Sequence, residues 1–169
     1  MTHNTDNTPN VWIGCLSCYP TALIGEWFDA AEAGEVTVEQ VHGGRDTGHE
    51  ELWVMDHENF GEWLKGECSP AEAQALAERM DSLGDDAEPF ILWARHIGAD
   101  PLEAEEDAFR DVYHGALWDS LEEYAESLVE DGVFGKVPES LRNHIDYASI
   151  ARDLDAEGYW IEKTHVFGP

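Results

Sequence analysis

Acidic residues run through this chain from end to end, interleaved with regularly spaced apolar residues. Asp and Glu number 37 against 9 Lys and Arg among 169 residues, which gives a formal net charge of −28 at pH 7. Residues 1–66, 67–106 and 107–169 carry net charges of −10, −9 and −9. Hydrophobic residues nevertheless make up 43% of the chain and aromatics 11%, too much for a disordered acidic segment. The sequence therefore predicts a folded protein whose whole surface is acidic, rather than a domain with an acidic tail.

This charge also bears on shape. A net charge far from zero destabilises a compact state through self-repulsion, and a globule of this length would have a radius of gyration of only roughly 15 Å. An elongated body spreads the same charge over a longer distance. We therefore expect several small modules in a row.

Several partners and locations are disfavoured by composition. Direct binding to nucleic acid needs clustered Lys and Arg, and nine bases among 37 acids do not supply them. Anionic membrane surfaces are disfavoured for the same reason. No stretch approaches the roughly 20 apolar residues of a membrane span, and the polar residues 1–9 lack the layout of a signal peptide. We expect a cytoplasmic protein that binds neither nucleic acid nor membrane.

The distribution of β-branched residues, capping residues, Pro and Gly predicts an α+β fold in three small modules. Residues 1–66 form an N-terminal antiparallel sheet with a helix, from strands at 10–16, 23–28 and 51–56, a helix or strand at 35–41 and a helix at 60–66. Residues 67–106 form a central helical module, with helices starting at Ser69-Pro70, at Glu88 and at Asp100-Pro101. Residues 107–169 form a C-terminal sheet-plus-helices module, with strands at 109–117 and 159–167 and helices at 121–130 and 138–154.

The helix expected at 121–130 separates two stripes of side chains. Its predicted buried stripe contains Leu117, Leu121, Ala125 and Leu128, at helical spacing. A second stripe contains Asp119, Glu122 or Glu123, Glu126 and Glu130. At about 1.5 Å per residue this acidic row spans roughly 16 Å, or one charge per roughly 5 Å. One DNA strand presents a phosphate about every 3.4 Å, so neighbouring rows would have to fill the gaps.

Three interpretations compete for a surface so poor in bases: salt adaptation, general solubility and imitation of a polyanion. Ordinary solvated helix faces alternate acids with bases, because like charges at i,i+4 cost a few tenths of a kcal/mol each. Salt adaptation predicts Asp-rich surfaces with few large apolar residues. The chain instead has 22 Glu against 15 Asp and 18 aromatic residues, which weighs against that interpretation.

A metal or redox site is the main chemical alternative. Cys15-Leu-Ser-Cys18 is a CxxC pair that could ligate zinc together with His42, His49 or His57. No second paired motif accompanies it, and no combination of nucleophile, base and orienting residue is recognisable. Adjacent acids such as Asp85-Asp86 and Glu105-Glu106 match no calcium-binding loop. We therefore predict no catalytic residues, no metal and no cofactor, with a metal-binding or redox protein using Cys15 and Cys18 as the alternative.

Several segments, in order along the chain, resemble the ArdA family of antirestriction proteins. They include Gly25-Glu-Trp-Phe-Asp-Ala30 near the start and residues 50–60, Glu-Glu-Leu-Trp-Val-Met-Asp-His-Glu-Asn-Phe. The strongest similarity is C-terminal, in Leu121-Glu-Glu-Tyr-Ala-Glu-Ser-Leu128, Pro138-x-x-Leu141, residues 145–154 and His165-Val-Phe167. The central third is similar only in acidity and length. The Cys15–Cys18 pair and the histidines of residues 42–57 are not part of the resemblance.

The resemblance implies an elongated three-module protein that dimerises through its C-terminal module. Its acids would imitate the phosphates of bent duplex DNA, occupy the DNA-binding groove of type I restriction–modification enzymes and inhibit both restriction and modification. Such a competitor needs neither catalysis nor a cofactor. An acidic interaction module for another basic DNA-binding protein remains a further alternative. The candidate mimic surface comprises Glu72, Asp81, Asp85, Asp86, Glu103, Glu105, Glu106, Asp119, Glu122, Glu123, Glu126 and Glu130.

Overall fold

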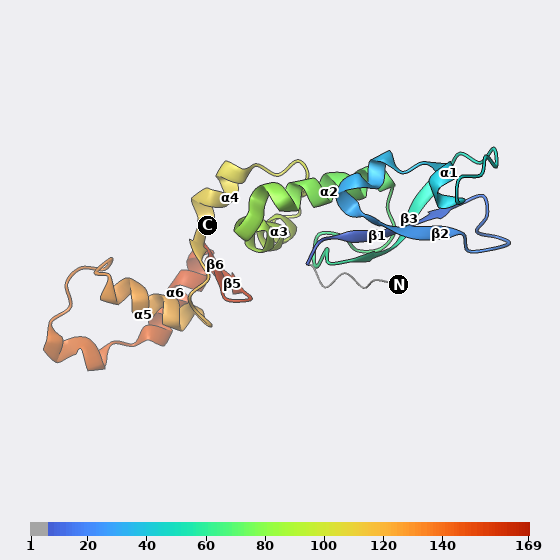
Figure 1. Ribbon diagram of the computed structural model, residues 1–169. Coiled ribbons are helices and arrows are strands. Elements are labelled where there is room, and N and C mark those ends of the chain that lie inside the picture. Colours follow the sequence, from blue (N-terminus) through green and yellow to red (C-terminus); the bar gives the residue numbers. More distant parts are fainter. Residues whose placement is uncertain (1–6) are drawn as a thin grey trace. The chain divides into compact units, whose positions relative to one another are not determined.

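A three-stranded antiparallel sheet opens the computed structural model, which describes residues 7–169 (Figure 1). β1 (Asn10–Cys15) lies at its centre, between β2 (Gly25–Asp29) and β3 (Leu52–Glu58). Side chains of a strand alternate between the two faces of its sheet, and β1 places Val11, Ile13 and Cys15 on one face, each at most 1% exposed. Cys15 is therefore the last member of a buried row. The three strands expected near the N-terminus are all present.

The opposite face of β1 carries Trp12, whose indole covers Gly25 of the neighbouring strand. A Cβ at Gly25 would lie 2.4 Å from the indole and 2.6 Å from the Ile13 carbonyl oxygen. Real Cβ atoms do not approach other atoms so closely. Gly25 therefore lets the large ring of Trp12 lie flat against the sheet.

Two short helices connect β2 to β3. η1 (Ala30–Glu35) is a 3-10 helix capped by the Asp29 carboxylate, and α1 (Val38–Val41) begins at Thr37. The Thr37 hydroxyl accepts from the Gln40 N–H, while the Gln40 side chain accepts from the Thr37 N–H. This reciprocal capping box fixes a helix start. Of the two alternatives for residues 35–41, the helix is right and the strand is wrong.

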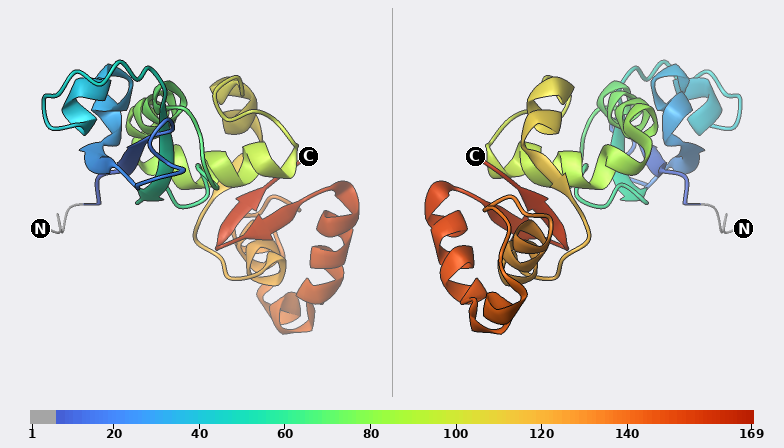
Figure 2. Two further views of the ribbon diagram at one scale, coloured as in Figure 1. Left: turned by 90° about the vertical axis from the view of Figure 1, so that its right-hand side faces the viewer. Right: turned by 90° about the vertical axis from the view of Figure 1, so that its left-hand side faces the viewer.

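The segment that directly follows the first sheet differs from expectation before its first long helix. Residues 60–66 form turns rather than a helix, because Gly61 and Gly66 adopt positive φ angles of 54° and 89° that an α-helix does not contain. α2 (Pro70–Leu83) begins where expected, with the Ser69 hydroxyl accepting from the Glu72 N–H. It packs against η1 and β3 (Figure 2), and the 3-10 turn η2 (Gly84–Asp86) follows it.

The segment after α2 was only partly predictable. α3 (Ala87–His96) is present as expected. No helix begins at Asp100-Pro101, because the Asp100 carboxylate accepts from the Leu102 N–H at 2.9 Å and closes a local turn instead. α4 (Glu106–Val112) begins five residues later. The strand predicted over residues 109–117 is confined to β4 (Tyr113–Gly115).

The C-terminal part forms a second antiparallel sheet, in the order β4-β6-β5. Its remaining elements are α5 (Leu121–Glu130), η3 (Glu139–His144), α6 (Tyr147–Glu157), β5 (Trp160–Glu162) and β6 (His165–Phe167). The single closing strand predicted at 159–167 is therefore wrong, since it is a hairpin. Lys163 and Thr164 form its turn with φ angles of 48° and 72°. Such turns usually carry Asn-Gly, so the sequence contained no hairpin signal here.

Aromatic rings hold the second sheet together. Phe167 is fully buried, and its ring stacks on Trp160 with the centroids 4.0 Å apart. Tyr113 lies on the other side of Phe167, and His96 stacks on the far face of Trp160 at 4.0 Å. α5 and α6 lie side by side (Figure 2), and their core contains Tyr124, Ala125, Leu154 and Val166.

The α+β class is confirmed, with a three-stranded sheet first, helices in the middle and a small sheet with helices last. Residue contacts group the chain into two units. The first unit runs to Ile91 and includes Gly98–Ala104, and the second comprises Leu92–Ile97 and Glu105–Pro169. The three-module boundaries at 66 and 106 stay a prediction. Of the polar lead-in expected at residues 1–9, residues 1–6 lie outside the described part.

None of the helices in the described range 7–169 combines the length and the apolar character that crossing a membrane requires.

Candidate functional site: an acidic surface

α5 presents an acidic row because its sequence fixes both its start and its buried face. The Ser120 hydroxyl caps the helix by accepting from the Glu123 N–H at 3.2 Å. The buried face consists of Tyr124, Ala125 and Val129, and the opposite face is left to solvent. Its exposed acids are Glu122, Glu123, Glu126 and Glu130, with Asp119 just before the helix.

The predicted buried stripe of α5 was partly wrong. Ala125 is fully buried, and Leu121 and Leu128 pack against the core of the second unit. Leu117, however, is 85% exposed. Leu117 lies before the helix cap at Ser120, so the helical spacing that predicted its burial does not apply to it.

Glu123 is both a surface acid and a structural group. Its carboxylate accepts a hydrogen bond from the Asp119 N–H at 2.9 Å, while its own N–H is bound by Ser120. Acids in the first helical turn are also stabilised by the helix dipole. Neutralising Glu123 would therefore disturb the helix start as well as the surface charge.

The remaining candidate acids lie at the ends of helices and in turns. Glu72 lies in the first turn of α2, Asp81 in its last turn, and Asp85 and Asp86 in η2. Glu103 lies in the turn before α4, Glu105 is the N-cap residue of α4, and Glu106 lies in its first turn. Of all twelve candidates, only Asp86 and Glu106 are half-buried; the other ten are exposed.

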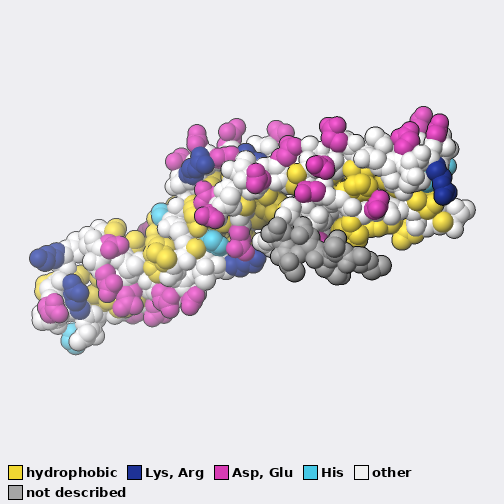
Figure 3. Space-filling model, viewed as in Figure 1, with side chains coloured by type: hydrophobic (Ala, Val, Ile, Leu, Met, Phe, Trp, Pro, Cys, Tyr) yellow, Lys and Arg dark blue, Asp and Glu magenta, His cyan; other side chains and the backbone are white. Residues whose placement is uncertain are grey.

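The structure places the candidates in both units. Five lie in the first unit, from Glu72 to Glu103, and seven lie in the second, from Glu105 to Glu130. In the view of Figure 3, acidic side chains are spread over both units, with few basic side chains among them. Whether these residues form one contact strip stays a prediction.

Basic residues neutralise little of this surface. Within the described residues, Lys65 pairs with Glu62 at 2.8 Å, and Arg110 pairs with Glu106 at 2.9 Å and with Asp107 at 3.7 Å. These pairs join neighbours on the same segment and lie at the surface, where such pairs contribute at most about 1 kcal/mol. The chain has 37 acids and 9 bases, so one-to-one pairing could neutralise only a minority of the carboxylates.

One cluster in the first unit offers ligands for a metal ion: Cys15, Cys18, His42 and His49. The CxxC pair was recognisable in the sequence, but the choice among the three histidines was open. The structure brings His42 and His49 to the cysteines. The ring of His57 lies against Phe60 instead, with centroids 5.7 Å apart.

The fold and the surface together define a class: a small α+β protein with two three-stranded sheets and a carboxylate-rich exterior. The model of the family described as "Antirestriction protein (ArdA)" matches residues 11–167. The chain therefore belongs to the ArdA family of antirestriction proteins, as its sequence resemblance predicted. A comparison with curated proteins finds none that matches the chain.

Proposed function

We propose that this protein is an acidic DNA mimic that occupies the DNA-binding groove of type I restriction–modification enzymes and inhibits both restriction and modification. Membership of an antirestriction family supports the target. The observation that carries the mechanism is a packed scaffold with ten of its twelve candidate carboxylates exposed in a chain of net charge −28. A groove built to bind phosphates attracts such a surface electrostatically.

The acidic row on α5 is the part of this surface with the clearest geometry. On the helix, Glu122 to Glu130 spans roughly 12 Å, about the length of three to four phosphates of one DNA strand, and Asp119 lies just before the helix. The row itself contributes five exposed carboxylates, Glu123 included. Side chains on the same face of a helix keep fixed spacing, so the row offers charge without the entropy cost of ordering a disordered tail.

The mechanism is competition, and it requires no bond to be made or broken. While the acidic surface lies in the groove, DNA is excluded from both the methylation and the cleavage reactions. The protein would act in the cytoplasm as a non-enzymatic inhibitor, and this competition uses no cofactor. An elongated arrangement of its modules, matched to the length of a DNA-binding groove, is part of the proposal.

A homodimer formed through the C-terminal module is a further part of the proposal, and residues 132–145 support it. This segment exposes Val133, Phe134 and Leu141, at 64%, 58% and 52%. Its charged residues are Lys136, Glu139 and Arg142, so it is nearly neutral in an otherwise acidic chain. Two copies of net charge −28 repel each other least through such an apolar, neutral surface.

The proposal is tested by adding the protein to purified type I enzymes and measuring how far it inhibits their DNA cleavage and DNA methylation. The variant D119N/E122Q/E126Q/E130Q removes the α5 row but keeps Glu123, whose carboxylate supports the helix start. The matched control D153N/D155N/E157Q/E162Q removes the same charge from exposed positions of the same unit that lie outside the candidate surface.

We expect the row variant to weaken inhibition about tenfold, or about 1.4 kcal/mol shared over four carboxylates. Each single neutralisation should have a small effect, and added salt should weaken inhibition by the wild-type protein. The control should stay near wild type. Folded wild-type protein that does not inhibit the enzymes would refute the proposal. Equal losses of inhibition in the two quadruple variants would show that the α5 row has no special part in the contact.

A further inference from the structure

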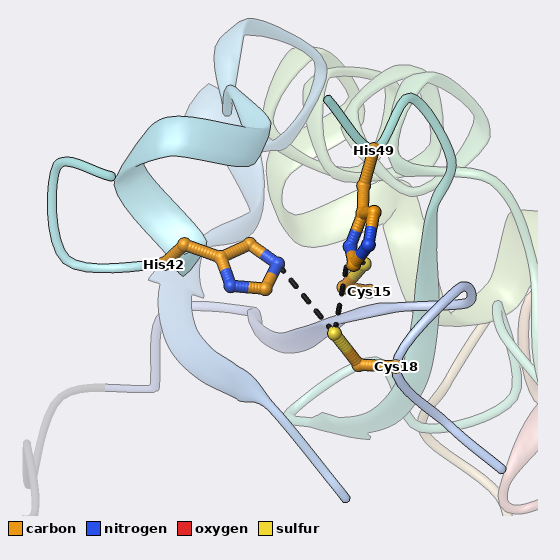
Figure 4. Close-up of side chains that lie close together, drawn as sticks. All are labelled: Cys15, Cys18, His42 and His49. Atoms are coloured by element: carbon orange, nitrogen blue, oxygen red, sulfur yellow. Dashed lines mark hydrogen bonds between the residues drawn. The ribbon is translucent and has the colours of Figure 1, made fainter. Parts of the chain in front are cut away.

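Four side chains from separate segments converge in the first unit (Figure 4). Cys15 ends β1, and Cys18 lies in the turn that follows, where its N–H donates to the Cys15 carbonyl at 3.2 Å. His42 is the C-cap residue of α1, and His49 lies in the loop before β3. Their ligand atoms all lie within 4.8 Å of one another. The fold therefore gathers two thiols and two imidazoles around one point.

The distances within the cluster match a single tetrahedral ion. The His49 Nδ1 lies 3.3 Å from the Cys15 Sγ and 3.5 Å from the Cys18 Sγ. The Cys18 Sγ also lies 3.8 Å from the His42 Nε2. Zinc bonds of about 2.3 Å to sulfur and about 2.0–2.1 Å to nitrogen place S and N ligands about 3.6 Å apart in a tetrahedron. One nitrogen facing two sulfurs, and one sulfur facing two nitrogens, indicates a common centre rather than separate hydrogen bonds.

The loop that supplies the histidines contains no other inward-facing side chain. From His42 to Glu51 only His42 and His49 are half-buried, and every other residue of this described segment is exposed. The loop contains no aliphatic or aromatic hydrophobic residue. Gly43, Gly44 and Gly48 add flexible positions with positive φ. Hydrophobic packing therefore does not hold this loop against the sheet, while its two imidazoles point at buried thiols.

We propose that Cys15, Cys18, His42 and His49 bind one structural Zn²⁺ that fastens the loop of residues 42–51 to the end of β1. Two sulfur and two nitrogen ligands suit zinc, whereas Ca²⁺ and Mg²⁺ require oxygen ligands. Four protein ligands leave no position for water, which distinguishes this site from a catalytic zinc centre. On binding, both thiols lose their protons to solvent and form Zn–S bonds, while the imidazoles bind as neutral ligands.

Metal content of the purified, untagged protein is the first test. We expect one zinc per chain in the wild type. The variants C18S and H49N should each retain less than about a tenth of it, since losing one ligand from a closed site removes most of its affinity. The matched controls C68S and H57N change a cysteine and a histidine of the same unit outside the cluster. Both controls should keep full zinc occupancy.

A second measurement uses the wild-type protein alone and does not depend on the folding of variants. Arg45 lies exposed in the loop, so trypsin cleavage after Arg45 reports loop opening. A chelator should accelerate this cleavage about tenfold or more by raising the open population, and added Zn²⁺ should reverse the effect. Cleavage after Lys136, exposed in the second unit, should not change. Replacement by Co²⁺ should produce the absorption of a tetrahedral thiolate complex.

The proposal would be overturned if the wild-type protein contained no zinc and a chelator did not change the rate of trypsin cleavage after Arg45. A Cys15–Cys18 disulfide in protein purified without oxidant would also overturn it, because it would indicate a redox pair instead. Neither measurement involves a restriction enzyme. The zinc site and the DNA-mimic function can therefore fail independently.

Discussion

The two sheets share three strands and antiparallel pairing, but different side chains hold each together. The strands of the first sheet have five to seven residues and bury an alternating aliphatic row, with Val11, Ile13 and Val54 fully buried. Each strand of the second sheet has three residues. There Phe167 lies between Trp160 and Tyr113. Short strands offer few backbone hydrogen bonds, so stacked rings must supply the cohesion that strand length supplies in the first sheet.

This difference makes the second sheet depend on single residues. Removing Phe167 deletes contacts to both neighbouring strands, because Phe167 pairs with Trp160 on β5 and with Tyr113 on β4. Ile13 also lies on a central strand, but longer strand pairing continues on both sides of it. The comparison therefore predicts unequal responses to similar mutations.

The largest expected effect is that of F167A, which should cost about 3–5 kcal/mol of unfolding free energy. Peptide-resolved hydrogen exchange should show lost protection in β4, β5, β6, α5 and α6. The matched variant I13A should cost about 2–5 kcal/mol and affect β1, β2 and β3. If either variant lost protection across both units, the two units would unfold together. The two sheets would then not respond independently to mutation, contrary to the comparison.

A pair of glycine substitutions gives the next largest contrast. G25A places a methyl group against the Trp12 indole and the Ile13 carbonyl of the first sheet and should cost about 1–3 kcal/mol. G168A in the second unit meets the His114 ring at 2.7 Å and the Tyr159 ring at 3.3 Å, both of them side-chain atoms rather than a backbone carbonyl, so the strain can be relieved by a shift of side chains. The melting temperature of G25A should therefore be well below that of G168A. The reverse order would mean that Trp12 moves more easily than His114.

Alkaline pH should weaken the first unit specifically. Burial, aided by the nearby Glu72 carboxylate, raises the pKa of the Cys68 thiol from its usual 9.0 to about 11. Between these values the unfolded chain releases the thiol proton and the folded chain keeps it, so stability falls as pH rises. Chemical denaturation from pH 8 to 11 should show a steeper fall for the wild type than for C68A. Equal slopes would exclude Cys68 as the cause.

Acid should weaken the second unit by a smaller amount. Burial against Tyr124 and Tyr159 lowers the pKa of the His114 imidazole below 6.5. As pH falls below 6.5, the unfolded chain binds a proton that the folded chain binds less readily, so stability decreases. H114Q should reduce this decrease in chemical denaturation at pH 7 and pH 5. The effect should be small, because His114 remains partly in contact with solvent. An unchanged slope in H114Q would contradict the assignment.

Features set by a few neighbouring residues were predictable from the sequence. Ser69-Pro70 and Ser120 begin helices because their hydroxyls accept N–H groups three residues ahead. The buried row ending at Cys15 follows from strand alternation. The exposure of most candidate acids follows because Asp and Glu are rarely buried without partners. The Ser-x-x-Glu pattern at Ser120 and Glu123 is typical of a capping box, but the Glu123 carboxylate accepts from the Asp119 N–H and not from the Ser120 N–H, so the pattern indicated a role at the helix start without giving the partner.

Features that depend on turns or on distant segments were not predictable. Asp100 closes a local turn instead of capping a helix, although its sequence fits both. Lys163 and Thr164 turn a hairpin without glycine. In the Cys15–Cys18–His42–His49 cluster, the CxxC pair was recognisable, but the choice among His42, His49 and His57 was open. His42 and His49 are selected over His57 by the end of α1 and the path of the following loop, and three-dimensional structure alone specifies both.

The Cys15–Cys18–His42–His49 ligand set also matters for the electrostatic field of the whole molecule. A divalent cation held by two thiolates and two neutral imidazole rings forms a complex without net charge. An anchor made from arginines or lysines would have placed positive charge beneath the carboxylates. Zinc held in this way would fasten a hydrophilic loop while the protein keeps its full net charge of −28, so rigidity and negative potential would not compete.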